Sequence, residues 1–153
     1  MKILVIYDSK YGNTEMVAKV IGEAIEGQVL HIGEVCNANL RDYELVIIGS
    51  PTHGGWFTEG IKQLFEDTLV LKGINAAVFD TRTKRSLFGF AAPRMAQRLE
   101  KKGGTLLAPP EGFIVLGIEG PLKDGELERA GEWVKDIVNR SATTHKYKDI
   151  QHV

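Results

Sequence analysis

Hydroxyl, amide and amine side chains gather in one short segment after the apolar residues 3–7, and their types suit anion binding. The segment comprises Ser9, Lys10, Tyr11, Gly12, Asn13 and Thr14. A helical pattern starts directly after it, so free backbone N–H groups and the positive end of a helix dipole converge there. We therefore expect a phosphate site built mostly from neutral donors. The alternative, in which Ser9, Asn13 and Thr14 only cap the helix, stays open on spacing alone.

A second candidate segment follows the apolar residues 45–48 and combines small residues with a large aromatic. It runs through Pro51, Thr52, His53, Gly54, Gly55 and Trp56. Two successive glycines let the backbone turn without a Cβ penalty, and an indole beside them can form a flat stacking wall. Packing of Trp56 under the next helix is the competing interpretation.

A third candidate segment follows the apolar residues 76–79. Asp80, Thr81, Arg82 and Thr83 open a long polar and cationic loop that ends in an aromatic and glycine mixture. Loops of this length in a small domain are commonly functional. Their polar groups can hydrogen-bond the edge of a heterocycle, and a plain solvated surface is the alternative.

The elements that must position these segments are visible in the hydrophobic pattern. Consecutive apolar residues at 3–7, 45–48, 76–79 and 113–116, with a weaker run at 29–32, indicate strands covered on both faces. Apolar stripes of helical period lie between and after them, at residues 16–24, 61–69, 92–99 and 127–138. The order predicts an α/β fold, a three-layer α/β/α sandwich with a doubly wound, five-stranded parallel sheet.

The three candidate segments all leave the carboxyl ends of predicted strands. In an open parallel sheet those ends share one edge, and ligands bind there beside the point where the strand order reverses. An anion loop, a planar aromatic and a polar loop facing one crevice suit a phosphorylated planar cofactor. The sequence thus predicts one binding site made from three separate parts of the chain.

Composition excludes several other classes of protein. The chain has 153 residues, a formal net charge of −1 and a pI near 6.4, so it lacks the basic excess of a nucleic-acid-binding protein. A single cysteine suits a reducing compartment, and we expect a cytoplasmic protein. The longest apolar runs are far shorter than a membrane span, so no membrane association is expected.

The domain organisation predicted from the pattern is simple. Residues 1–140 carry all the periodic segments and form one domain. Residues 141–153 are polar and aperiodic, which indicates a loose C-terminal tail. A monomer is the default expectation for the oligomeric state.

The sequence resembles the flavodoxin family from residue 2 to about residue 140. Residues 9–14 match the family's loop for the phosphate of flavin mononucleotide (FMN), and residues 49–56 look like the loop whose aromatic stacks on the isoalloxazine ring. Residues 80–83 occupy the position of the loop that holds the pyrimidine edge of that ring. The resemblance is to short-chain members, because no long insertion splits the last strand.

The resemblance implies a cofactor, a strand order and a function. The cofactor is FMN, the strand order is 2-1-3-4-5, and the protein carries single electrons between redox partners through a stabilised flavin semiquinone. A rotating Gly54–Gly55 peptide is expected to accept a hydrogen bond from the reduced ring. The partners implied are a reductase or ferredoxin-like donor and an unknown acceptor.

Two features depart from the family pattern. Arg82, Lys84 and Arg85 lie where the family has an acidic rim around the flavin. No tyrosine marks the second stacking position, for which Phe88 and Phe90 are the candidates. The departures bear on partner choice and redox potential more than on the cofactor.

An enzyme on the same fold is the alternative to a carrier without enzymatic activity of its own. An FMN-dependent NAD(P)H:quinone or flavin oxidoreductase would use His53 and Tyr11 as proton donors over the flavin. A response-regulator receiver domain is rejected, because it needs an acidic residue where this chain has Ser50.

Overall fold

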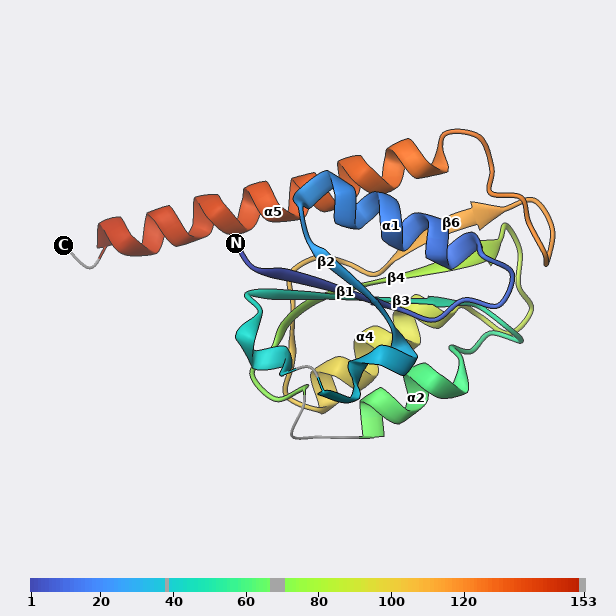
Figure 1. Ribbon diagram of the computed structural model, residues 1–153, viewed down its shortest axis with the longest axis horizontal. Coiled ribbons are helices and arrows are strands. Elements are labelled where there is room, and N and C mark those ends of the chain that lie inside the picture. Colours follow the sequence, from blue (N-terminus) through green and yellow to red (C-terminus); the bar gives the residue numbers. More distant parts are fainter. Residues whose placement is uncertain (38, 67–70, 152–153) are drawn as a thin grey trace.

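The consecutive apolar segments form the parallel strands of a single sheet. The computed structural model describes residues 1–37, 39–66 and 71–151. Its strands are β1 (Ile3–Tyr7), β2 (Gln28–His31), β3 (Leu45–Pro51), β4 (Asn75–Thr83), β5 (Thr105–Leu106) and β6 (Glu111–Val115). Figure 1 shows the sheet edge-on between two layers of helices. The predicted three-layer α/β/α architecture is confirmed.

The strand order is β2-β1-β3-β4-β5, with β6 also paired to β4, and every pairing between these strands is parallel. The predicted order 2-1-3-4-5 is therefore confirmed, with one refinement at its last position. The strands β5 and β6 share that position, since β5 pairs with the first residues of β4 and β6 with the last. The chain leaves the sheet between them.

Two strands are longer than the apolar runs that predict them. The parallel pairing of β3 with β4 continues through Ser50↔Asp80 and Pro51↔Thr81. Pairing of β4 with β6 then extends through Arg82↔Ile114 and Thr83↔Val115. Residues 80–83, expected in a loop, thus belong to a strand, because backbone pairing on both sides of β4 outweighs their polar character.

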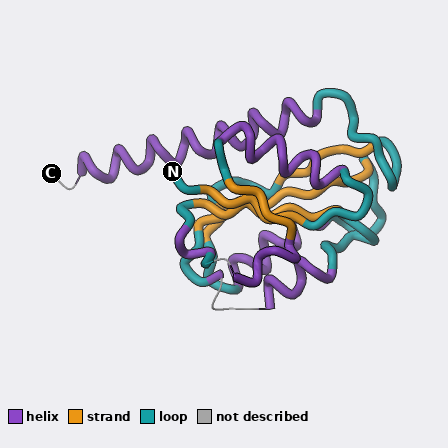
Figure 2. The backbone as a smooth tube through the Cα atoms, viewed as in Figure 1, coloured by secondary structure: helices purple, strands orange, loops and turns teal. Residues whose placement is uncertain are grey.

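Within the described residues, four helices cover the two faces of the sheet (Figure 2). On one face lie α1 (Asn13–Ile25) and α5 (Glu126–Gln151), and on the other α2 (Glu59–Glu66) and α4 (Ala91–Lys101). Short 3₁₀ turns, η1 (Ile32–Asn37) and η2 (Leu40–Asp42), replace a full helix after β2, as the lack of periodicity indicates. The predicted end of the second helical stripe, at Leu69, lies outside the described residues.

Each face of the sheet has its own hydrophobic core. Along β1, Leu4 and Ile6 pack toward α2 and α4, whereas Ile3, Val5 and Tyr7 pack toward α1 and α5. All five are buried, because side chains alternate between two covered faces. Double coverage is the reason that this strand is apolar at every position.

The end of the chain differs from its prediction. Helix α5 continues to Gln151 and projects beyond the sheet (Figure 1), so the expected loose structure of residues 141–153 is wrong up to that point. The division of the chain into a domain and a tail stays a prediction. Among the helices that the structure describes, none combines the length and hydropathy needed to cross a membrane.

An ion-pair cluster holds the start of α5 against β6. The buried carboxylate of Glu126 accepts the backbone N–H of Ile114 at 2.6 Å and Nε of Arg129 at 2.9 Å. Arg129 also donates to Glu111 at 3.0 Å and lies 4.5 Å from the centre of the Phe113 ring. The Arg129 hydrogen bonds lower the pKa of Glu126, burial opposes this, and the Ile114 N–H adds to the lowering. The ionised carboxylate therefore stabilises the fold.

We expect Glu126→Gln to lower the free energy of unfolding by about 2 kcal/mol at neutral pH, because it removes charged hydrogen bonds. A depressed carboxyl pKa stabilises the folded state above the ordinary value of 4.5, and that stability is lost as pH falls below it. The variant and the parent should therefore converge in acid. Urea titrations across pH check this, with the exposed Glu128→Gln as control; a pH-independent difference contradicts it.

Candidate functional site

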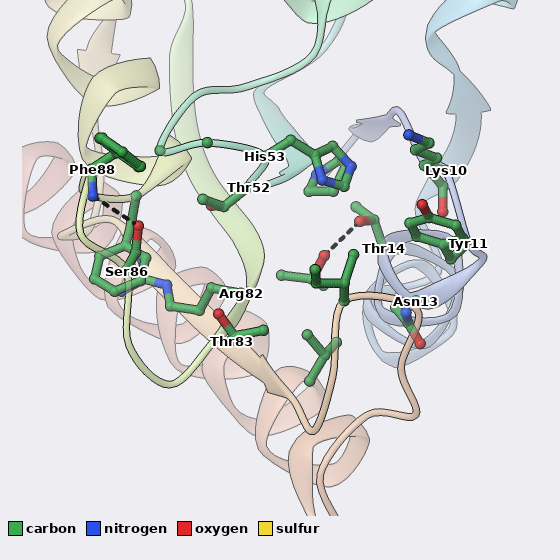
Figure 3. Close-up of a pocket in the computed structure, with 18 of the residues that line it drawn as sticks. Lys10, Tyr11, Asn13, Thr14, Thr52, His53, Arg82, Thr83, Ser86 and Phe88 are labelled. Carbon is green, nitrogen blue, oxygen red and sulfur yellow. Dashed lines mark hydrogen bonds between the residues drawn. The ribbon is translucent and has the colours of Figure 1, made fainter.

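A cavity of about 270 Å³ opens at the carboxyl edge of the sheet (Figure 3). Its wall comes from the loop before α1, the end of β3 with its following turn, the segment from β4 to α4, and the loop after β6. The residues named from sequence that line it are Ser9, Lys10, Tyr11, Asn13, Thr14, Pro51, Thr52, His53, Gly54, Gly55, Thr81, Arg82 and Thr83. Gly12, Trp56 and Asp80 do not line it. The predicted convergence of three segments on one site is thus observed.

Hydrogen bonds to one hydroxyl group, that of Ser9, hold the loop before α1 in its conformation. Ser9 Oγ accepts the backbone N–H of Gly12 at 3.1 Å and that of Glu15 at 3.4 Å. Gly12, with a φ of 93°, is the N-cap residue of α1 and makes no side-chain hydrogen bond. It allows the backbone to turn into the helix but does not line the cavity. The first turn of α1 consequently faces the cavity with Asn13 and Thr14.

A hydrogen bond between two buried hydroxyls forms part of the cavity wall. Thr14 Oγ1 and Thr81 Oγ1 lie 2.7 Å apart, and both residues are almost fully buried. The dashed line between Thr14 and the strand opposite it in Figure 3 marks this contact. It joins the phosphate-type loop to β4, so the two predicted segments form one continuous surface.

The glycine pair forms a tight turn with a defined geometry. The backbones of His53 and Trp56 exchange two hydrogen bonds of 3.0 Å, and Gly54 and Gly55 have φ angles of 56° and 83°. Positive φ at both central positions is the signature of a type I′ turn. A Cβ at Gly55 would meet the Phe88 carbonyl oxygen at 2.2 Å, whereas one at Gly54 would meet nothing within 4 Å. The turn is therefore pressed against the segment after β4.

His53 has the one buried side-chain polar atom without a hydrogen-bond partner among the described residues, its Nε2. Its ring meets Tyr11 edge-on, with 6.3 Å between ring centres (Figure 3). Burial, followed by the charge of Lys10, lowers the pKa of His53, which keeps the imidazole neutral at pH 7. Native structures rarely leave such an atom unpaired, so His53 Nε2 is a candidate partner for a molecule bound at the cavity wall.

Trp56 lies outside the cavity, contrary to the expected stacking wall. The residue is 46% exposed, with the Arg94 guanidinium 4.2 Å from the ring centre and Phe57 packed edge-on. The aromatic side chains that do line the cavity are Tyr11, Phe88 and Phe90. A stacking role for Trp56 therefore has no support from its position, and Phe88, on the opposite side from Tyr11 in Figure 3, is the better candidate.

Asp80 holds Arg82 rather than a ligand. Its fully buried carboxylate accepts Nε and Nη2 of Arg82 at 2.6 and 2.7 Å and the N–H of Ala92 at 2.8 Å. Burial raises the pKa of Asp80, and the Arg82 hydrogen bonds and charge oppose the rise. The Arg82 guanidinium also lies 3.8 Å from the centre of the Phe90 ring. Arg82 is thus a fixed, charge-paired part of the wall.

Three lining residues were not singled out from sequence, namely Ser86, Val115 and Ile118, and Arg85 was noted only as a departure from an acidic rim. Val115 and Ile118 follow from the same rule as the others, because the carboxyl end of β6 lies at the same sheet edge. Asn13 Nδ2 donates to the Glu119 carbonyl at 3.2 Å and connects that loop to the loop before α1. Arg85 and Ser86 belong to the predicted polar loop, whose path depends on tertiary contacts.

The two glycines of the turn provide a matched pair of substitutions. We expect Gly54→Ala to lower the free energy of unfolding by about 1 kcal/mol, the cost of a left-handed alanine. Gly55→Ala adds a collision with the Phe88 backbone, so we expect at least about twice that loss. Urea denaturation of both variants checks the order, which equal losses would contradict.

Comparisons with known proteins agree with this architecture. The sequence model of the family described as Flavodoxin matches residues 5–133. A flavodoxin of Aquifex aeolicus (strain VF5) is 32% identical over 74 residues, which cover 44% of this chain and only 40% of that protein. A solved flavodoxin structure from the domain Archaea has a TM-score of 0.74 at 22% identity, covering 92% of this chain and 98% of that one. Flavodoxin 2 from Bacillus cereus gives 0.75 at 23% identity, with coverages of 92% and 99%. The chain belongs to the flavodoxin family, whose members bind FMN.

Proposed function

We propose that this protein binds FMN in the cavity and carries single electrons between redox-partner proteins. The observation that carries the proposal is the unpaired, buried Nε2 of His53 in a cavity whose other end is the start of a helix. FMN has a phosphate at one end and a ring with hydrogen-bonding edges at the other. The residues present fit both ends.

The phosphate end of the cofactor fits the loop before α1. Asn13 and Thr14 open the helix and line the cavity, with Ser9, Lys10 and Tyr11 beside them. Free N–H groups in the first turn attract an anion without requiring a full positive charge nearby. We propose that these residues bind the phosphate, and that Thr81 holds the Thr14 side chain in place.

The ring end fits the opposite part of the cavity. Thr52, His53 and the glycine pair line it from the β3 side, and Thr81, Arg82 and Thr83 line it from β4. Bound FMN supplies the capacity to accept and release one or two electrons. The neutral His53 ring would pair its Nε2 with the ligand, and Phe88 would cover the ring on one side.

The glycine turn supports one-electron chemistry in this proposal. The Gly54–Gly55 peptide lies at the cavity wall, and the space where a Cβ of residue 54 would stand is open. A peptide that can turn its carbonyl toward the ligand can hold a proton on the ring at an intermediate stage of reduction. We propose that this hydrogen bond between the peptide carbonyl and the ring stabilises the one-electron-reduced state.

The partner proteins, a monomeric state and a cytoplasmic location are further parts of the proposal. They rest on the family resemblance, on the single cysteine and on the near-neutral net charge. An NAD(P)H-dependent quinone or flavin oxidoreductase stays the alternative. It would use His53 and Tyr11 as proton donors, and the lowered pKa of His53 weakens that role near neutral pH.

The cofactor prediction is tested by the purified protein and two threonine variants. The protein should be yellow and release FMN on denaturation. Thr14→Val should lower FMN affinity by about 10- to 100-fold, because a hydroxyl hydrogen bond to a charged group is lost. Thr105→Val, an exposed position in β5, is the control and should bind normally. A colourless protein without affinity for FMN contradicts the proposal.

The electron-carrier prediction is tested by anaerobic redox titration. We expect two separate one-electron steps, with long-wavelength absorbance from half-reduced flavin between them, and a smaller amplitude in Gly54→Val, whose β-branched side chain restricts the peptide. NADH alone should leave the colour unchanged. A single two-electron step with rapid bleaching by NADH favours the oxidoreductase instead.

A further inference from the structure

Exposed apolar side chains line the cavity or adjoin its lining residues in the chain. Leu87 is 96% exposed, Ile118 71% and Phe88 66%, and Leu116 and Trp56 are also largely exposed. Phe88 and Ile118 line the cavity itself, and the other three each adjoin a lining residue in the chain. A gathering of exposed apolar side chains beside a binding site marks a surface where another molecule docks.

The charges at the same surface have one sign. The cavity lining contains Lys10, Arg82 and Arg85 and no carboxylate, and the exposed Lys84 adjoins it in the chain. Arg82 is paired with Asp80, but Lys10, Lys84 and Arg85 form no ion pair within the described parts of the chain. The whole chain has a net charge of −1. The acidic residues that adjoin the lining in the chain are Asp8, Glu15, Asp80 and Glu119. Asp8 is hydrogen-bonded to Thr58, Glu15 is paired with Lys19 and Asp80 with Arg82, so the unpaired charge at this surface is mainly positive.

We propose that this surface, the apolar residues named above with Lys10, Lys84 and Arg85, is the docking site for an acidic redox protein. The inference rests on the proposed function, since it assigns a partner class to the same cavity. Complementary charge steers the encounter, and the apolar centre excludes water once the two proteins touch. The partner that fits is a small electron-transfer protein with carboxylates around an apolar patch.

A second copy of this chain fits the surface less well. A symmetric dimer brings the same patch of each subunit together, which here would oppose Lys84 and Arg85 with their own copies. Like charges juxtaposed in an interface oppose association. An anionic membrane offers the right charge, but the cations cluster at the mouth of a cofactor cavity, where electrons must pass to a partner.

The test measures binding of the FMN-loaded protein to two probes of opposite charge. A plant-type ferredoxin is the acidic probe and cytochrome c the basic one, with affinities from titration calorimetry at about 0.02 M and about 0.5 M salt. We expect binding to ferredoxin and not to cytochrome c, with a loss of at least about tenfold in affinity at high salt. Amide shifts should centre on residues 84–90.

Matched charge reversals separate the local patch from the overall charge. Lys84→Glu/Arg85→Glu should abolish ferredoxin binding. Lys72→Glu/Lys101→Glu changes the net charge by the same amount at the opposite sheet edge, where Lys101 ends α4 and Lys72 precedes β4, and this variant should retain ferredoxin binding. Leu87→Gln should weaken ferredoxin binding and preserve its salt dependence, because Leu87 contributes apolar contact alone.

Each other outcome overturns the docking proposal. These outcomes are no binding to ferredoxin, equal binding to both probes, equal loss in both reversal pairs, or tighter binding to phosphatidylserine vesicles than to ferredoxin through the same residues. The anaerobic redox titration tests the proposed function independently of these binding measurements. A protein that carries single electrons but fails to bind ferredoxin loses only the docking site, and one that binds ferredoxin without a one-electron stage loses only the proposed function.

Discussion

The parallel pairing of β3 with β4 is the contact on which the candidate site depends. It continues to Pro51↔Thr81, and the N–H of Thr52 then donates to the Thr81 carbonyl at 2.9 Å. Next to this pairing, the Thr52 hydroxyl accepts the N–H of Ala91, the first residue of α4, and the Asp80 carboxylate accepts the N–H of Ala92. One length of backbone pairing thus places the glycine turn, the end of β4 and the start of α4 beside the same cavity. The polar residues at this edge of the sheet are therefore positioned by the extension of β3 and β4 beyond their apolar residues.

The charge at the surface of this protein depends more on which charged side chains are buried than on the overall composition. Of the cations after β4, Arg82 is bound to a buried carboxylate and lies against Phe90, so it acts as a structural member of the wall. Lys84 and Arg85 are exposed and form no ion pair within the described parts of the chain. A net charge of −1 is therefore compatible with a positive surface at the cavity mouth.

The sequence predicted most of the architecture because its signals are local. Double-sided burial makes strand residues apolar at every position, and a helix start after Gly12 follows from the pattern of neighbouring residues. The convergence of three loops was predictable since the carboxyl ends of parallel strands share an edge. Where the prediction was wrong, the observed structure differed from what the local sequence pattern favours. Residues 80–83 joined β4 because partners on both sides completed their hydrogen bonds, and residues up to Gln151 continued a helix despite their polar composition.

The amino-acid sequence by itself determined the α/β class and, through its resemblance to a family, the cofactor, because the first depends on short-range periodicity and the second on motifs that are each contiguous in the chain. The tertiary structure alone decided which side chains face the cavity. It turned Trp56 outward beneath Arg94, buried Asp80 under Arg82, and left Nε2 of His53 unpaired at the wall. These choices depend on contacts between segments far apart in the chain, such as Gly55 against Phe88, whose energies no local pattern encodes.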